Sequence, residues 1–324
     1  MNSSESKLFS QLKKEDTIAI ISHINPDGDS IGSVLALGMG LRNKSKNVYM
    51  YINDDIPQKY KFLQGIQNLI LYDEANCPRI DYCFVLDCGD IARLGYSRAI
   101  LNNSSTIINI DHHVTNTRFA DINILDQRAS STSEIIFNLL EKSKIPINKN
   151  IAQALYTGIA TDTGNFVYDN TSSKTHKTVS KLLDYGVDLN LISYNLYQNK
   201  DLNLVRYTGY ILQNLKLYYN GKLAIILTFE KDLKEYRIHD GDVDGIINYA
   251  RNIQGVKVAI LIKEIEDDKL KISFRSKDNI DVSKLAKEFE GGGHAKASGA
   301  TIRGNIRETS DKIISKVGSR FGWR

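Results

Sequence analysis

Short runs of apolar residues recur through the first half of the chain, with more polar stretches of helical length between them. Four runs, at 17–22, 48–52, 82–86 and 106–110, have the length and the β-branched and aromatic content of buried strands. Helical patterns at 30–41 and 57–67 lie between them. Strands that alternate with helices predict an α/β domain, in which a parallel sheet carries helices on both faces.

Three further helices are predicted after this sheet, at 132–144, 148–161 and 174–185. Ser131 and Glu134 have the spacing of a capping box at the start of the first of them, and Gly186 follows the third as a stop signal. The next stretch, 188–212, is helical in pattern but more polar. We interpret it as a helical linker.

Strands pair as hairpins in the remaining part of the chain. Runs at 215–219 and 222–228 flank Asn220-Gly221, a dipeptide typical of tight hairpin turns, and runs at 256–262 and 270–275 flank an acidic turn. Helices near 243–252, 282–289 and 306–317 complete a smaller α+β unit. The predicted organisation is a first domain at 1–187, a linker at 188–212 and a second domain at 213–324, with a cleft between the domains.

Composition narrows the class of protein. The 324 residues are 42% hydrophobic and 25% charged, which is typical of a globular protein. No apolar run reaches the ~20 residues that span a bilayer, and the first residues lack a signal-peptide pattern, so we expect a cytoplasmic protein without a membrane partner. The three cysteines form no C-x-x-C pair, which argues against a disulfide framework or a zinc ribbon. A net charge of +4 is too small for a dedicated duplex-binding protein but suits a small anionic substrate.

Carboxylate and imidazole side chains gather where the apolar runs end. They are His23, Asp27 and Asp29 after the first run, Asp87 after the third, Asp111, His112 and His113 after the fourth, and Asp162 at the end of a helix. Because ligands bind beyond the carboxyl ends of parallel strands, we expect these side chains to converge there. Each cluster alone is an ordinary turn or helix end. Four such clusters at successive element ends indicate one site.

Carboxylates that converge at neutral pH repel one another unless protons or cations neutralise them. Two divalent cations would balance Asp27, Asp29, Asp87 and Asp162, with His23 and His112 completing the ligand sets. A mixed set of imidazoles and carboxylates suits Mn²⁺, with Mg²⁺ as a substitute, and the lack of thiolates disfavours structural zinc. Two metals ~3.5–4 Å apart would activate a water and neutralise the phosphate that it attacks.

These motifs together resemble the DHH phosphoesterase superfamily, named for Asp111-His112-His113, and within it the subfamily with a DHHA1-type second domain. Gly291-Gly292-Gly293-His294 is similar to the signature of that second domain, so the resemblance covers nearly the whole chain. It implies a first metal held by His23, Asp27 and Asp87, and a second held by Asp29, Asp87, His112 and Asp162, with Asp87 as the bridge.

The resemblance also implies roles for residues that do not bind metal. Asp111 would orient its neighbours and His113 would face the substrate phosphate, so Asp87, Asp111 and His113 are the predicted catalytic residues. Arg275 and His294 would bind the substrate from the second domain. Glycine amides at Gly292 and Gly293 can approach an anion closely, and Arg251 is a further candidate.

The chain is similar to standalone bacterial enzymes that hydrolyse oligoribonucleotides of about two to five nucleotides to mononucleotides and dephosphorylate 3′-phosphoadenosine 5′-phosphate (PAP). The expected partners are therefore short single-stranded RNA, a dinucleotide and a nucleoside bisphosphate, and the superfamily suggests a homodimer. A phosphodiesterase for cyclic di-AMP or for linear pApA would share every motif. A single-strand exonuclease would usually be longer, and a manganese pyrophosphatase would share the first domain alone. From another class, a nucleotide sensor would bind without turnover.

Overall fold

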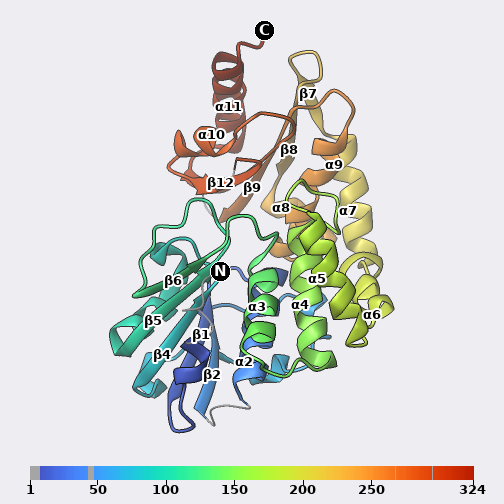
Figure 1. Ribbon diagram of the computed structural model, residues 1–324. Coiled ribbons are helices and arrows are strands. Elements are labelled where there is room, and N and C mark those ends of the chain that lie inside the picture. Colours follow the sequence, from blue (N-terminus) through green and yellow to red (C-terminus); the bar gives the residue numbers. More distant parts are fainter. Residues whose placement is uncertain (1–7, 43–46, 267, 294) are drawn as a thin grey trace. The chain divides into compact units, whose positions relative to one another are not determined.

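The chain folds into two units, Met1–Asn199 and Lys200–Arg324. The computed structural model describes residues 8–42, 47–266, 268–293 and 295–324 (Figure 1). The division falls inside 188–212, the expected linker. α6 (Leu189–Ser193) and a π-helical turn at Tyr194–Gln198 end the first unit, and α7 (Leu202–Gln213) begins the second. The expected linker is therefore shared between the two units.

The first unit is built on a six-stranded sheet in the order β3-β2-β1-β4-β5-β6. The strands are β1 (Thr17–Ser22), β2 (Asn47–Ile52), β3 (Leu69–Leu71), β4 (Ile80–Leu86), β5 (Ser104–Asp111) and β6 (Ile122–Leu125). Every pairing is parallel. The α/β class and the four predicted strands are confirmed, and the short strands β3 and β6 are additional edges.

Four helices cover one face of this sheet: α2 (Gly28–Leu41), α3 (Thr132–Lys142), α4 (Lys149–Asp162) and α5 (Ser173–Asp184) (Figure 1). α2 and α3 lie directly on the strands, over residues such as Ile18, Ile20 and Phe84, and α4 and α5 pack against these two helices. The other face carries Ala19, Ile21 and Val85 and is covered by a kinked 3₁₀ segment, Ile91–Asn103. The sheet is thus covered on both faces, as expected, but among the described residues only one face carries α-helices.

The prediction of a helix at 57–67 is wrong. Two 3₁₀ turns, Gln58–Tyr60 and Ile66–Asn68, occupy this stretch. Gly65 between them has φ +89°, in the left-handed region, which interrupts a right-handed helix. Tyr60 and Leu63 bury their side chains. Two buried side chains are too few for the apolar stripe that stabilises a surface helix.

The second unit is a mixed sheet in the order β11-β12-β10-β9-β8-β7. Its strands are β7 (Lys216–Tyr218), β8 (Leu223–Thr228), β9 (Val258–Glu266), β10 (Lys269–Ser276), β11 (Gly292–Gly293) and β12 (Ala297–Arg303). β8 and β9 are parallel and the other pairs are antiparallel. Both predicted hairpins are present, so the α+β class of this part is confirmed.

Helices cover both faces of the second sheet with separate apolar cores. α10 (Ser283–Lys287) and α11 (Ile306–Phe321) pack on one face, against Ile260, Ile262 and Ile272. α7 and α9 (Ile247–Asn252) pack on the other, against Ala259 and Leu261. α8 (Glu230–Tyr236) follows β8. Within the described part of the chain, no helix combines the length and the apolar character needed to cross a membrane.

Candidate metal centre

The predicted metal ligands lie at the carboxyl ends of three neighbouring strands. His23 follows β1, Asp87 follows β4, and His112 follows β5, and these strands are adjacent in the sheet. Two helices bring the remaining carboxylates: Asp27 caps α2 and Asp29 lies in its first turn, while Asp162 is the last residue of α4. The site is thus formed where polar residues succeed buried apolar strands.

The Asp87 carboxylate lies at the centre of the cluster. Its Oδ2 is 3.4 Å from His23 Nε2, and its Oδ1 is 3.6 Å from His112 Nε2. His23 Nε2 is also 3.9 Å from Asp27 Oδ2, and His112 Nε2 is 3.4 Å from Asp162 Oδ2. Among the described residues, three groups have ligand atoms within 4.8 Å of one another. They are His23 with Asp27 and Asp87, Asp29 with His112 and Asp162, and Asp87 with His112 and His113. The structure therefore brings together every predicted metal ligand.

Hydrogen bonds fix which ring nitrogen each histidine presents. His23 Nδ1 lies 2.7 Å from the carbonyl oxygen of Ile24, to which it donates, so Nε2 carries the lone pair that faces the carboxylates. His113 Nδ1 lies 2.6 Å from Asp111 Oδ1. His113 Nδ1 is also 3.7 Å from Asp87 Oδ1, so its shorter contact is the one with Asp111.

Asp111 is fully buried and is held from both sides. Its Oδ1 meets His113, and its Oδ2 accepts a 2.6 Å hydrogen bond from Asn116 Nδ2. Asn116 also donates to Asn109 Oδ1, and Asn109 donates to the carbonyl oxygens of Val85 and Cys88 beside Asp87. Asn109 and Asn116 could not be identified from the sequence, because asparagine beside a turn is common for local reasons.

Burial and mutual repulsion perturb the acids of the cluster. Burial, followed by repulsion from Asp29 and Asp27, raises the pKa of Asp87 well above its usual range. Burial and the same kind of repulsion raise the pKa of Asp162 to about 8, although His112 opposes the shift. Burial lowers the pKa of His112, but Asp162 and Asp87 outweigh it and raise the value to about 9. Carboxylates in such a place require protons or cations as partners.

The donor set fits divalent cations. Oxygen and imidazole ligands in one buried cluster are those of mixed sites for Mn²⁺ and related ions, and the ligand groups found among the described residues contain no cysteine. Asp87 also adopts φ +54°, a left-handed conformation that is uncommon for a residue with a side chain. Uncommon backbone conformations of this kind gather at functional sites.

The amino end of α3 supplies contacts that the sequence reasoning missed. The amide of Thr132 donates to Asp29 Oδ2 at 2.6 Å and that of Ser133 to Asp29 Oδ1 at 2.8 Å. The Thr132 hydroxyl donates to Asp87 Oδ1 at 3.1 Å. Burial raises the pKa of Asp29, and the hydrogen bonds from Ser133 at the helix N-terminus oppose that rise. One hydroxyl also orients the central carboxylate. The sequence signal for these contacts is the run of four hydroxyl-bearing residues at 130–133, because a helix cap requires only one such side chain.

Glu134 departs from the predicted capping box. Its amide donates to Ser131 Oγ at 3.1 Å, as a cap requires. Its buried carboxylate, however, accepts from the Ser130 hydroxyl at 2.7 Å and from Thr175 Oγ1 at 2.9 Å. Glu134 thereby connects the loop before α3 to α5.

Glycine allows the helices that carry Asp29 and Asp162 to approach one another. A Cβ at Gly158 of α4 would lie 2.0 Å from Ser133 Oγ and 2.9 Å from Asp29 Oδ1. A Cβ at Gly28 of α2 would lie 2.3 Å from Thr161 Oγ1. Any larger residue at these positions would separate the helices and the ligands with them.

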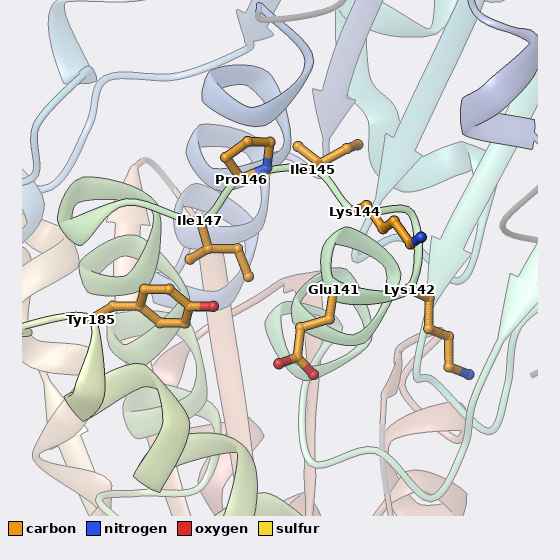
Figure 2. A pocket seen from close by; sticks show the side chains of 7 residues that line it. All are labelled: Glu141, Lys142, Lys144, Ile145, Pro146, Ile147 and Tyr185. Atoms are coloured by element: carbon orange, nitrogen blue, oxygen red, sulfur yellow. The ribbon is translucent and has the colours of Figure 1, made fainter.

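A hollow of about 540 Å³ lies elsewhere on the first unit (Figure 2). It is lined by Glu141, Lys142, Lys144, Ile145, Pro146, Ile147 and Tyr185. Lys142 is the last residue of α3, whereas Thr132 at its first residue contacts the ligands, and 11 residues of helix separate the two places by ~15 Å. The hollow contains none of the predicted ligands.

The predicted substrate residues of the second unit lie around β10. Arg275 is on β10, and Arg251 is in the last turn of α9, which contacts that strand. Gly292 and Gly293 form β11, are exposed, and pair with β12, the neighbour of β10. His294 lies outside the described residues. The structure thus places four of the five residues on one part of this unit.

Comparison with known proteins assigns the chain to a family. The DHH family, N-terminal domain, matches residues 17–159, and the DHHA1 domain matches residues 221–320. The chain is 30% identical over 300 residues to the probable bifunctional oligoribonuclease and PAP phosphatase NrnA of Streptococcus mutans, covering 90% of this chain and 92% of that one. It is 29% identical to the bifunctional oligoribonuclease and PAP phosphatase NrnA of Bacillus subtilis, covering 97% of each.

A solved structure agrees with this assignment. The crystal structure of an exopolyphosphatase-related protein from Bacteroides fragilis has a TM-score of 0.91 and 29% identity, and the match covers 97% of this chain and 96% of that one. Both matched domains, the near-complete coverage and the strand-end cluster agree with the resemblance noted in the sequence. The chain therefore belongs to the DHH family, in the branch that joins a DHH domain to a DHHA1 domain.

Proposed function

We propose that this protein is a metal-dependent phosphoesterase that hydrolyses very short oligoribonucleotides to mononucleotides and dephosphorylates PAP. The relatives that carry both activities in their names match 90% or more of the chain. The observation that carries the proposal is the Asp87 carboxylate, whose two oxygens face His23 and His112 on opposite sides. A carboxylate placed in this way is suited to bridging two cations.

In this proposal His23, Asp27 and Asp87 hold one Mn²⁺, and Asp29, Asp87, His112 and Asp162 hold the other. Two divalent ions bound there would supply a hydroxide nucleophile at neutral pH and neutralise charge on the phosphate. Support comes from the two ligand groups and from the raised pKa values of Asp87 and Asp162, which positive charge would relieve.

His113 and Asp111 act on the substrate rather than on the ions. Asp111 holds Nδ1 of His113, so Nε2 is the atom that meets the phosphate. In its protonated form this ring donates through Nε2 to a phosphate oxygen and stabilises the charge that develops during hydrolysis. Asn116 keeps Asp111 in place for this purpose.

The second unit holds the remainder of the substrate. We assign to Arg275 the binding of a phosphate, with Arg251, His294 and the amides of Gly292 and Gly293 as further donors. Support comes from the guanidinium, which matches phosphate geometry, and from the exposed glycine backbone of β11. A cytoplasmic location and a homodimer complete the proposal. Light scattering of the purified protein tests the dimer.

A substrate panel tests the proposal. Mononucleotide release from pApA, from a five-nucleotide RNA, from cyclic di-AMP and from PAP would be measured with Mn²⁺, with Mg²⁺ and with a chelator. We expect turnover of the linear dinucleotide and of PAP, the greatest rate with Mn²⁺, and loss of activity with chelator. A preference for cyclic di-AMP would replace the proposed substrate, and binding without turnover would indicate a sensor.

A further inference from the structure

The loop that follows Asp162 in the first unit has an uncommon backbone conformation. Gly164, Asn165 and Phe166 have φ values of +56°, +58° and +65°, so three consecutive residues lie in the left-handed region. Residues with a side chain rarely enter this region, and then mostly one at a time, and it is least favourable for a bulky residue such as Phe166. Strain of this kind persists only where surrounding contacts enforce it, so we asked which contacts this loop serves.

Hydrogen bonds to the end of α4 hold the loop in this shape. The amide of Asn165 donates to the carbonyl oxygen of Ala160 at 2.7 Å, and the amide of Phe166 donates to Thr163 Oγ1 at 3.0 Å. The next two amides along the chain both donate to the carbonyl oxygen of Thr163 at 3.0 Å. The chain therefore reverses its direction within a few residues.

The reversal brings Asn170 back to the end of α4, where its side chain contacts two segments that are far apart in the sequence. Its Nδ2 donates to the carbonyl oxygen of Asp162 at 3.2 Å and to the carbonyl oxygen of Ser130 at 2.9 Å. Asp162 is a predicted metal ligand, and Ser130 is a fully buried residue just before α3. One side-chain amide therefore joins the end of α4 to the segment that precedes α3.

The segment that Asn170 holds leads directly into the residues that contact a second predicted ligand. The amides of Thr132 and Ser133 donate to the two carboxylate oxygens of Asp29 at 2.6 and 2.8 Å. Asp29 and Asp162 belong to one proposed ligand set, but they lie on different helices, α2 and α4. Asn170 therefore connects the backbone of one ligand with the backbone that holds the other. The distance between the two carboxylates depends on this connection.

Glu134 holds the same segment from its other side. Its fully buried carboxylate accepts from the Ser130 amide at 3.2 Å and from the Ser130 hydroxyl at 2.7 Å. The same carboxylate accepts from Thr175 Oγ1 at 2.9 Å, and the ammonium of Lys174 lies 3.5 Å from its Oε1. Ser130 is thus held by Glu134 through its amide and hydroxyl and by Asn170 through its carbonyl oxygen. A backbone segment held at three points has little freedom to move.

The other proposed ligand set is held by contacts of a different kind. His23 donates from Nδ1 to the carbonyl oxygen of the next residue at 2.7 Å. Asp27 Oδ1 accepts from two amides in the first turn of α2 at 3.1 and 3.0 Å. These contacts lie within the turn between β1 and α2 and do not involve Asn170. A change at Asn170 should therefore affect one ligand set and spare the other.

We propose that Asn170 is a positioning residue of the metal centre, which fixes Asp29 and Asp162 relative to each other and so sets the affinity for the cation that they bind, without affecting the other cation. The proposal rests on the two ligand sets of the proposed function. The left-handed turn serves to deliver the Asn170 side chain to the two carbonyl oxygens, and Glu134 holds the segment that carries one of them.

Titration of the full-length protein with Mn²⁺ tests this proposal, because it counts the bound ions and measures each affinity without a substrate. We expect the wild type to bind two ions that give the electron paramagnetic resonance signal of a spin-coupled pair. Asn170→Ala removes both hydrogen bonds, and we expect the affinity for one ion to fall about 10–100-fold, as for other groups that hold a ligand in place. The affinity for the other ion should be unchanged, and the signal of a single ion should replace that of the pair.

A second background identifies which ion is affected. Asp162→Ala lacks a ligand of the set that Asn170 serves, so this variant should retain the ion bound by His23 and Asp27. Adding Asn170→Ala to it should leave the remaining affinity unchanged. A further loss in the double variant would place the effect of Asn170 on the wrong ligand set and overturn the proposal.

Asn165→Gly is the matched control. Asn165 is an exposed asparagine of the same loop, and glycine adopts its left-handed conformation without strain, so both affinities should stay at the wild-type values. Ser130→Ala removes the hydroxyl that Glu134 accepts from but keeps the carbonyl oxygen that Asn170 contacts. It should weaken the same ion as Asn170→Ala does, by a smaller factor.

An equal fall in both affinities, no change in either, or the same fall in Asn165→Gly would contradict the positioning role. Urea unfolding in the presence of a chelator shows whether each variant is folded before metal is added. If Asn170→Ala does not fold, Ser130→Ala decides the question. Unchanged Mn²⁺ binding in that variant would then count against the proposal.

Metal binding and turnover, measured on the same samples, separate this inference from the proposed function. If the wild type binds two ions and Asn170→Ala weakens one, but the wild type hydrolyses neither pApA nor PAP, the phosphoesterase fails and the positioning role stands. If the wild type hydrolyses them and Asn170→Ala binds both ions as tightly as the wild type does, the positioning role fails and the phosphoesterase stands. If the wild type binds fewer than two ions, the two-ion centre and the positioning role both fail.

Discussion

The two units of the molecule carry net charges of opposite sign. Residues 1–199 contain 19 Lys and Arg against 21 Asp and Glu, whereas residues 200–324 contain 23 against 17. In the first unit Asp29 and Asp87 are buried and repel each other, and in the second the ammonium groups of Lys263 and Lys271 both contact Asp244. Unbalanced buried charge costs stability in the free protein, and a ligand of opposite sign relieves it. The contrast indicates cations as ligands of the first unit, whereas the second carries a net positive charge.

The largest effect is expected at the central carboxylate of the first unit. Asp87→Asn keeps the size of the side chain but removes the charge that faces both His23 and His112. We expect kcat to fall at least about a thousandfold, because both ligand sets are weakened together. Phosphate release, with metal content measured on the same sample, checks the prediction.

Asp90→Asn is the matched control for this variant. Asp90 is exposed in the same loop, and its carboxylate caps the next segment by accepting from the amide of Ala92 at 2.8 Å. Asparagine caps as well as aspartate does, so activity should be unchanged. If Asp87→Asn retained its two metals and its rate, the proposed bridging role would be refuted.

Substitutions of the two adjacent histidines should separate metal binding from catalysis. His112 faces Asp87 and Asp162, whereas His113 bonds to Asp111 and presents its other nitrogen. We expect His112→Ala to lose metal, and His113→Ala to retain metal but lose about 10²–10³ in kcat, as when a donor to developing charge is removed. Equilibrium dialysis and rate measurements give both quantities. An equal fall of metal content in the two variants would contradict the division of roles.

The cluster of candidate ligands in the first unit was predictable because its signals are local. Each apolar run is long enough to identify a buried strand, and Asp87 and His112 come directly after one. A parallel sheet then places consecutive strand ends side by side without further information. The short edge strands β3 and β6 were missed for the converse reason. Their side chains include exposed Leu71 and Ile122, so they lack a continuous apolar run.

The contacts that support the site were not predictable, because they join distant parts of the chain. Thr132 meets Asp29 across 103 residues, and locally it looks like part of a helix cap. The burial of Lys263 was not predictable from the sequence either. A lysine near the end of a strand normally lies on the surface, and only the packing of Asp244 over it shows that its ammonium is buried.

A smaller effect is expected from the hydroxyl that orients the central carboxylate. Thr132→Val keeps the shape of the side chain and removes its hydrogen bond to Asp87. We expect a 10–100-fold loss of metal affinity, as for other groups that hold a ligand in place. Metal titration measures it, and Thr132→Ser, which keeps the hydroxyl, should stay near wild type. Equal losses in the two variants would show that packing rather than the hydrogen bond matters.

The smallest effect tests the second unit, through stability rather than activity. Asp244→Asn removes a carboxylate that pairs with buried Lys263. Breaking a fully buried pair costs ~3–5 kcal/mol, but Asp244 is 40% exposed, so we expect the free energy of unfolding to fall by about 2 kcal/mol. Urea unfolding at pH 7 measures this. Asp242→Asn, an exposed neighbour, is the matched control and should change stability little.

The difference in unfolding free energy between wild type and Asp244→Asn should depend on pH. Lys263 and Lys271 outweigh burial and hold the pKa of folded Asp244 below its usual value. The stability that its ionised carboxylate contributes is therefore fully present above the unfolded pKa of about 3.9, and it is lost as the pH falls through the lower folded value. The gap in unfolding free energy between wild type and Asp244→Asn should stay constant from about pH 7 to 5 and close below about pH 4. A gap that persisted in acid would show that the variant disturbs packing, and the contrast between the two units would then rest on the first alone.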